Sequence, residues 1–399
     1  MKVNKYSQTD TFVRSPYVKK KIEKSLERLL GFCFSKYFYE NKKINAILSQ
    51  GTNNNNNKSE FSNEEVSKRF GNGLNFFGRL FGVDNTNNPI AESLLLSSLL
   101  KLDTLYSEDR YKDIIAILRD EIIDKSLRDE SGISWKYPID SISSKFNSPR
   151  NSSAFLPTIL VARSFLDLYE VIGDDQDLSI IKSIQNFLLR NVEVDQDGTI
   201  HWKYLSDVDS YDYSTTILGA GFLAGAASIT QMKDSLDFSK KAVSHVCRKQ
   251  MIDGSWTYGS EHRLEWIDSL QMAYILWGIK DYIDYSSDKS FLSNLEDGYE
   301  YYKHKFVLTG GEVKKFHNKT YPMDIICSAA AIITLVRLGD VSYAIRVAEW
   351  AIDNMQEDVG YFFISKSRFW RIKNLYVGST QFWMALALSE LLSRLNNED

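Results

Sequence analysis

Five short loops, each marked by a glycine, recur along the chain at intervals of 66, 56, 57 and 49 residues. Each of the first three has a Trp-x-Tyr sequence soon after its glycine, and the glycines of the five loops are Gly132, Gly198, Gly254, Gly311 and Gly360. Regular spacing of this size indicates stacked supersecondary units, each too small to bury its apolar face alone. The chain is therefore expected to fold by repetition.

Two kinds of helical pattern alternate around these loops. Before the loops come amphipathic segments, at about residues 18–48, 107–127, 178–191, 235–250, 291–306 and 341–355. After the loops, or in the corresponding place before the first one, come apolar segments that begin at Asn88, Ser153, Ser214, Asp268, Asp324 and Ser379. Amphipathic helices keep one side in water, whereas the apolar helices are expected to meet water only at their ends.

Both patterns are satisfied by an all-α (α/α)6 toroid, in which six inner helices are surrounded by six outer helices and the rim loops hold short extended pieces. An open α-solenoid uses the same helix pairs without closing them and is the alternative. We expect one domain over residues 1–399. The Asn-rich stretch at 49–60 is predicted to be a mobile loop within it.

Composition excludes several classes of function. The net charge is -4, with 48 basic and 52 acidic residues, which does not indicate nucleic-acid binding. The three cysteines are isolated in sequence, so neither a disulfide framework nor a thiolate metal site is expected, and no metal ion or cofactor is predicted. No export signal and no run of roughly 18 apolar residues is found, so a cytoplasmic protein without a membrane segment is expected. The oligomeric state stays open.

The loops that lead from outer to inner helices should meet at one rim, where residues distant in sequence surround a common cavity. Aromatic side chains are frequent in these loops. We expect them to form panels that bind a substrate, with the members Trp135, Tyr137, Trp202, Tyr204, Trp256, Trp266, Tyr321 and Trp370.

Acidic residues recur at the start of three apolar helices, namely Asp212, Asp268 and Asp324. Asp is a common N-cap, so a structural role is one interpretation. The other is that carboxylates crowd around one pocket and serve as catalytic acid and base. His262 and His317 also fall in the rim loops and are candidates for proton transfer or substrate binding.

The stretch "DGSWTYG", followed by "EWIDS", resembles the toroid proteins of polysaccharide biosynthesis and, more distantly, the helical domain of glucuronyl C5-epimerases and the six-hairpin glycosidases. The resemblance implies that the chain binds or acts on an oligosaccharide, a polysaccharide or its lipid-linked precursor. It also implies that Trp256, Tyr258, Trp266 and Asp268 lie at the sugar site.

A second stretch, "QMIDGSW", resembles the repeat of squalene-cyclase and prenyltransferase toroids, and "DVDSYD" resembles the acidic motif of class II terpenoid cyclases. Ser210 stands where that motif has its last Asp, which argues against proton-initiated cyclisation.

Three hypotheses follow for the function. The first is a carbohydrate-active enzyme: a hydrolase would use two of the three recurrent aspartates, whereas an epimerase or lyase would use Tyr258 or His262 as base and Arg263 to hold a sugar carboxylate. The second is a terpenoid cyclase or prenyltransferase with Asp209 or Asp212 as the acid. The third is a non-catalytic scaffold or glycan-binding protein.

Overall fold

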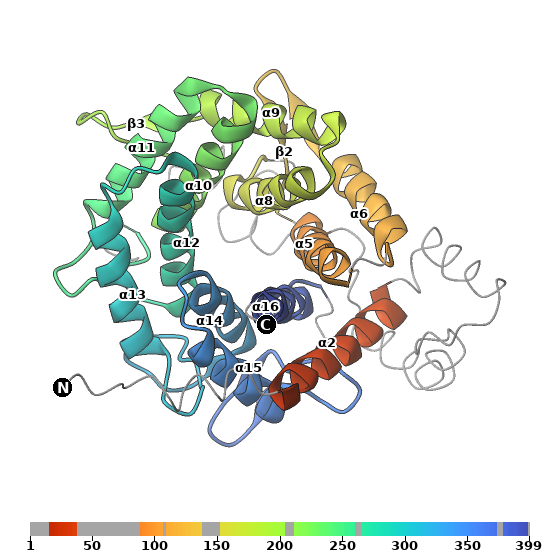
Figure 1. Cartoon of the computed structure of the whole chain (residues 1–399). Coiled ribbons are helices and arrows are strands. Elements are labelled where there is room, and N and C mark those ends of the chain that lie inside the picture. Colours follow the sequence, from red (N-terminus) through yellow and green to blue (C-terminus); the bar gives the residue numbers. More distant parts are fainter. Residues whose placement is uncertain are drawn as a thin grey trace, which may run out of the picture.

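The computed structural model describes residues 16–37, 88–106, 109–137, 152–203, 211–259, 265–372 and 378–397, which form two concentric rings of helices (Figure 1). The inner ring consists of α5 (Pro89–Tyr106), α8 (Phe155–Ile172), α10 (Tyr213–Thr230), α12 (Ser269–Ser286), α14 (Ile325–Arg337) and α16 (Ser379–Asn396). The outer ring consists of α2 (Pro16–Tyr37), α6 (Lys112–Asp124), α9 (Asp175–Arg190), α11 (Lys233–Cys247), α13 (Leu292–Phe306) and α15 (Val341–Met355).

The ring closes because α16 packs against α5, so the helix that ends the described chain lies beside the first inner helix. The first helix in sequence, α2, packs on α15 and α16 and completes the outer ring. The predicted (α/α)6 toroid is therefore confirmed, and the open solenoid is wrong.

Two outer helices begin three or more residues away from their predicted starts. The second outer helix begins at Lys112 rather than at residue 107, after Asp109 with a left-handed φ of 51°. The third begins at Asp175 rather than at residue 178, because the side chain of Asp174 caps it by accepting the N–H of Gln176. The first is described only as far as Tyr37, and the loop predicted at 49–60 lies outside the described residues.

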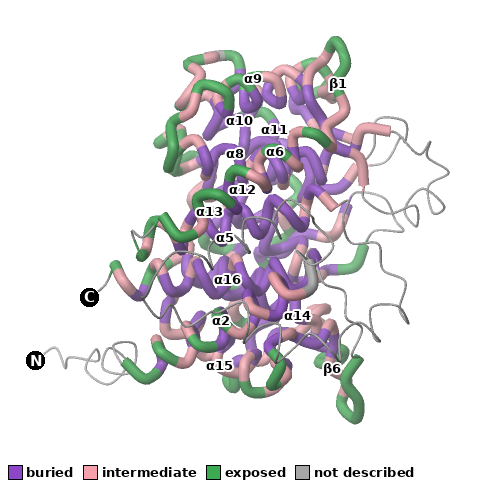
Figure 2. Tube along the Cα trace, turned by 90° about the vertical axis from the view of Figure 1, so that its right-hand side faces the viewer, coloured by how far each residue is buried: buried purple, intermediate pink, exposed green. Residues whose placement is uncertain are grey.

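Short antiparallel strands occupy the loops that lead to the inner helices. They are β1 (Leu127–Asp129) with β2 (Gly132–Ser134), β3 (Glu193–Val194) with β4 (Ile200–His201), and the three-stranded set of β5 (Met323–Asp324), β6 (Ser365–Lys366) and β7 (Arg371–Ile372). The registers pair Leu127 with Ser134, Glu193 with His201 and Met323 with Lys366. Seen from the side, β1 and β6 project on the same side of the ring (Figure 2).

The tryptophan of each Trp-x-Tyr sequence joins an outer helix to the next inner helix. The indole N–H groups of Trp135, Trp202 and Trp256 donate to carbonyl oxygens near the ends of α6, α9 and α11, at distances of 2.8, 2.9 and 2.9 Å. The backbone N–H of Trp135 then donates to Oγ1 of Thr158 on α8, at 2.9 Å. Each tryptophan is thus a buried residue that connects the outer helix of its repeat unit to the next inner helix.

The glycines of the loops allow a second contact between units. A Cβ atom at Gly132, Gly254, Gly311 or Gly360 would clash with a backbone carbonyl of the following outer helix, which is α9, α13, α15 or α2 respectively. Gly198 differs, because a Cβ atom there meets nothing within 4 Å. The second loop therefore lacks this close backbone contact with its neighbouring outer helix. None of the helices in the described part of the chain is long and apolar enough to cross a lipid bilayer.

Candidate functional site

The three recurrent aspartates are the N-caps of α10, α12 and α14. The carboxylate of Asp212 accepts the N–H of Thr215 at 2.7 Å, that of Asp268 the N–H of Gln271 at 3.0 Å, and that of Asp324 the N–H of Ile326 at 3.0 Å. The capping role is therefore present in all three. Asp212 is 2% exposed and its carboxylate also accepts the hydroxyls of Ser214 and Thr215. Burial raises the pKa of Asp212 above its usual value.

Two of these caps keep a second partner at the rim. The Oδ2 atom of Asp268 accepts the indole N–H of Trp266 at 3.1 Å, and Oδ2 of Asp324 lies 3.1 Å from Nζ of Lys315. Burial raises the pKa of Asp268 above its usual value. Trp266 packs on Tyr258 with ring centroids 4.8 Å apart and is 41% exposed. The rim cluster of Tyr258, Trp266, Asp268, Lys315 and Asp324 is thus partly open to solvent.

The predicted aromatic panels are wrong for three of their tryptophans. Trp135 and Trp202 are 0% exposed and Trp256 is 1% exposed, since each indole is directed into the layer between the two rings. A loop tryptophan that looks solvent-facing by local alternation is drawn inward because the layer below offers both apolar volume and a carbonyl acceptor. Their contacts are those of packing residues.

The other predicted residues are scattered along the loops. Tyr137 is half-buried, Tyr321 is 39% exposed and Trp370 is 65% exposed in the turn between β6 and β7. His317 lies near the rim cluster, with Nδ1 3.4 Å from the carbonyl oxygen of Ile267. Four candidate residues lie outside the described residues and stay untested, namely Tyr204, Asp209, His262 and Arg263.

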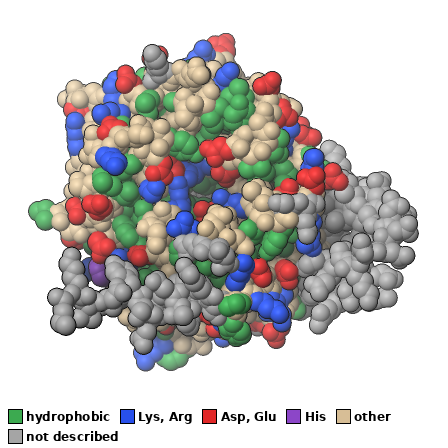
Figure 3. Space-filling view, in the orientation of Figure 1, with side chains coloured by type: hydrophobic (Ala, Val, Ile, Leu, Met, Phe, Trp, Pro, Cys, Tyr) green, Lys and Arg blue, Asp and Glu red, His purple; other side chains and the backbone are tan. Residues whose placement is uncertain are grey.

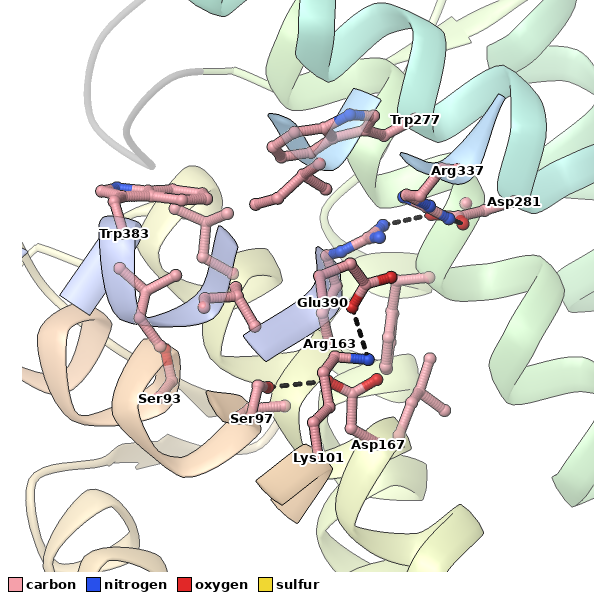
Figure 4. Close-up of a pocket in the computed structure, with 18 of the residues that line it drawn as sticks. Ser93, Ser97, Lys101, Arg163, Asp167, Trp277, Asp281, Arg337, Trp383 and Glu390 are labelled. Carbon is pink, nitrogen blue, oxygen red and sulfur yellow. Dashed lines mark hydrogen bonds and ion pairs between the residues drawn. The ribbon is translucent and has the colours of Figure 1, made fainter. Parts of the chain in front are cut away.

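A cavity that the sequence reasoning missed lies on the ring axis. This axial pocket has a volume of about 170 Å³ and is lined by residues from all six inner helices. The space-filling view shows a hollow at the centre of the corresponding face, with Lys and Arg side chains inside it (Figure 3). Trp277 and Trp383 form one wall, with ring centroids 6.0 Å apart (Figure 4).

Charged side chains form a belt around this pocket. Lys101, Asp167, Asp281 and Arg337 each stand twelve residues after the first residue of their helices, which are α5, α8, α12 and α14, and Glu390 stands eleven residues after that of α16. At a rise of about 1.5 Å per residue they share one level along the axis. These five residues and Arg163, which lies one turn away on α8, are called the charged belt below.

Every member of the charged belt has a polar partner, which is either another belt residue or a residue that lines the axial pocket. The two oxygens of the Asp281 carboxylate accept hydrogen bonds from Arg163 and Arg337 (Figure 4). Nζ of Lys101 lies 2.7 Å from Oε2 of Glu390. The hydroxyl of Ser97 donates to Oδ2 of Asp167 at 2.7 Å.

These pairings set the protonation states in the pocket. Burial alone would raise the pKa of Asp281, but the guanidinium groups of Arg163 and Arg337 outweigh it and hold that pKa below its usual value of 3.8. Burial alone would lower the pKa of Lys101, but the carboxylates of Glu390 and Asp167 raise it above 10.5. Near neutral pH the pocket therefore offers fixed cationic donors, anionic acceptors and two aromatic faces.

The expectation that the inner helices meet water only at their ends is wrong, because Lys101, Arg163 and Asp167 are only half-buried and lie more than one turn before the ends of α5 and α8. A signal was present in the sequence: each apolar segment except that of α10 carries a charged residue at a similar depth, as in "LLKLD", "IKDYI", "LVRLG" and "LSELL". In the closed ring these positions face the axis and one another.

Comparison with known proteins gives a likeness of fold. No protein-family model matches the sequence, and no curated protein matches it. Among solved structures, cellobiose 2-epimerase from Spirochaeta thermophila is 10% identical with a TM-score of 0.62, and the alignment covers 90% of this chain and 99% of that chain.

Two further structures have the same arrangement. A GH76 α-mannanase from Bacteroides thetaiotaomicron is 10% identical with a TM-score of 0.61, covering 82% of this chain and 94% of that one. Cellobiose 2-epimerase from Bacillus thermoamylovorans is 11% identical with a TM-score of 0.61, covering 83% and 98%. The resemblance to (α/α)6 toroids of the six-hairpin glycosidase type is therefore confirmed at the level of the fold.

Proposed function

We propose that this chain is a carbohydrate-active enzyme of the hydrolase, lyase or epimerase type, and that it binds a sugar in the axial pocket. The observation that carries the proposal is the pairing of two tryptophan rings, Trp277 and Trp383, with the charged belt inside an otherwise apolar ring. Aromatic faces stack on the apolar faces of sugar rings, while charged groups bind hydroxyls with strong hydrogen bonds. The toroids named above are two cellobiose 2-epimerases and an α-mannanase, which supports the same class for this chain.

The size of the pocket restricts the ligand. At about 170 Å³ it is smaller than the roughly 300–1,000 Å³ that encloses a drug-sized ligand. We infer that one sugar residue enters and that the rest of an oligosaccharide or polysaccharide stays outside.

The protonation states restrict the chemistry. Asp281 stays ionised between its two arginines, so it accepts hydrogen bonds from hydroxyls and does not donate a proton. Asp167 of α8 and Glu390 of α16 also line the pocket, and we assign proton transfer to these two carboxylates.

The test is a binding and turnover screen with neutral and uronic-acid mono- and oligosaccharides, read by calorimetry and by NMR of the sugar. We expect Trp383→Ala to weaken binding by about tenfold or more, the loss of one aromatic contact of roughly 1.4 kcal/mol. Asp167→Asn and Glu390→Gln should lower turnover by at least about 100-fold if these carboxylates transfer protons.

The matched controls lie at the rim. Trp266→Ala and Asp268→Asn should leave sugar affinity unchanged if the axial pocket is the site. Loss of binding in these two variants alone would place the sugar site at the rim cluster, as the sequence pattern predicts. The proposed carbohydrate function would then still hold. No binding by the wild-type protein across the screen would overturn the proposed function and favour a scaffold.

A further inference from the structure

Two histidines and an aspartate, distant from the axial pocket, converge where β3 and β4 meet α11. Nδ1 of His245 lies 2.8 Å from Oδ2 of Asp195, and Nδ1 of His201 lies 3.4 Å from the same oxygen. The three candidate ligand atoms all lie within 4.8 Å of one another. Asp195 follows β3, His201 is in β4 and His245 is in the last turn of α11, so the cluster joins the hairpin to an outer helix.

We propose that Asp195, His201 and His245 bind a divalent transition metal ion, Zn²⁺ in the first place, and that this ion fastens the β3–β4 hairpin to α11. Two imidazoles and a carboxylate are a donor set that suits zinc, with a fourth position left for water. Zinc bonds of about 2.0–2.1 Å at tetrahedral angles place ligand atoms about 3.3–3.4 Å apart. His201 and Asp195 already have this spacing, and His245 would move away from Asp195 by about half an ångström.

Neighbouring side chains enclose this cluster on one side and leave it open to solvent on the other. His245 is 4% exposed, and its Nδ1 atom, which faces Asp195, also lies 3.3 Å from Oγ1 of Thr199. Tyr211 covers His201, with ring centroids 4.1 Å apart. The Asp195 side chain is 35% exposed, so an ion and its water can enter from solvent.

The position of the cluster in the repeat explains why a metal ion would stabilise the attachment of the β3–β4 hairpin to α11. Four loop glycines pack against the backbone of the next outer helix, but Gly198 makes no such contact. In this second loop, side chains link the hairpin to α11 and its C-terminal end instead: the Asp195–His245 contact and the pair of Arg248 and Asp197, at 2.7 Å. A metal ion would supply the firm attachment that close backbone packing supplies in the other loops.

The experiment uses the full chain without a histidine tag, freed of metal with a chelator. We expect calorimetry with ZnCl₂ to show one site, and Co²⁺ to give the visible absorption of a tetrahedral complex. His201→Gln should weaken Zn²⁺ binding by about 100-fold or more, as the loss of a direct ligand exceeds the roughly 10–100-fold typical of outer-shell changes. Asp195→Asn is a second, more exposed variant with the same expected direction.

The matched control is His304→Gln, an exposed histidine on α13 whose Nε2 pairs with Glu300 at 3.1 Å. Its Zn²⁺ affinity should equal that of the wild type, and Zn²⁺ should raise the midpoint of thermal unfolding of both. Absence of a stoichiometric site, or equal affinity in His201→Gln and His304→Gln, would overturn the proposal and leave a hydrogen-bonded cluster. This result is independent of whether the axial pocket binds a sugar.

Discussion

Asp281 shows how one residue can determine the state of the axial pocket. Its carboxylate lies between two guanidinium groups, and the space for it exists because α10 has Gly221 opposite, where a Cβ atom would lie 3.0 Å from that of Asp281. A buried charge pair is costly to break, since the remaining partner stays buried without compensation. The residue therefore matters for stability as well as for ligand binding.

We expect Asp281→Asn to lower the free energy of unfolding at pH 7 by about 3–5 kcal/mol, because Arg163 and Arg337 would face each other without an anion. The pKa of Asp281 is depressed in the folded state, so its contribution is present above pH 3.8 and is lost as the pH falls below that value. The difference between wild type and variant, measured by urea unfolding, should shrink in that acid range.

The matched control for this change is Asp284→Asn on the same helix. Asp284 is 50% exposed and pairs with Lys280, an i,i+4 contact worth well under about 1 kcal/mol. An equal decrease in the free energy of unfolding in the two variants would show that the Asp281–arginine pairing stabilises the fold no more than an exposed ion pair does.

At the scale of elements, the inner ring depends on how closely α10 and α12 approach each other. A Cβ atom at Gly278 of α12 would clash with the carbonyl oxygen of Ile217 on α10, which is backbone and cannot rotate away. The small residues of α10, in "GAGFLAGAAS", allow the same closeness along its length. Gly and Ala in these helices thus set the diameter of the ring.

Gly278→Ala should therefore lower the free energy of unfolding by about 1–3 kcal/mol, in spite of the better helix propensity of Ala. In Gly225→Ala, the helical control, the new atom would meet side-chain atoms of Leu166 at 2.9 Å and Tyr285 at 3.0 Å, and these can shift. Its loss should be smaller. A Gly278→Ala protein as stable as the wild type would contradict this account of the packing.

The outer ring is closed by contacts between its first helix, α2, and its last, α15, with the loop that follows α15. Nζ of Lys21 lies 2.8 Å from Oδ2 of Asp353, and the Arg28 guanidinium donates to the carbonyl oxygen of Glu357 at 2.7 Å. Gly360 packs against the backbone at Arg28 with a φ of 109°. The two polar contacts thus join residues that are 332 and 329 positions apart in sequence.

We expect Gly360→Ala to destabilise the ring by more than the roughly 1–2 kcal/mol of left-handed strain, because it also forces α2 away. Gly339→Ala separates the two effects: its φ is 88°, but a Cβ atom there meets nothing within 4 Å. Hydrogen exchange should show loss of amide protection in α2 for Gly360→Ala only. Similar protection in both variants would mean that closure does not depend on this contact.

Local pattern was enough to predict the fold. The alternation of amphipathic and apolar segments and the capping positions of Asp212, Asp268 and Asp324 are short-range properties, since helix geometry and N-cap chemistry act within a few residues. The glycine-marked period shows that these local patterns repeat along the chain. They sufficed for the number of helices, their order and which ring each belongs to. The limits of the first outer helix and the loop at 49–60 stay predictions.

Only the tertiary structure decided what the side chains do. The tryptophans are buried because the space between the two rings accepts them, and the charged belt forms because closure turns isolated charges on separate helices toward one axis. Asp195 and His245 meet because the β3–β4 hairpin packs on α11, fifty positions apart in sequence. Such encounters depend on packing between distant segments, which a periodic sequence pattern does not encode residue by residue.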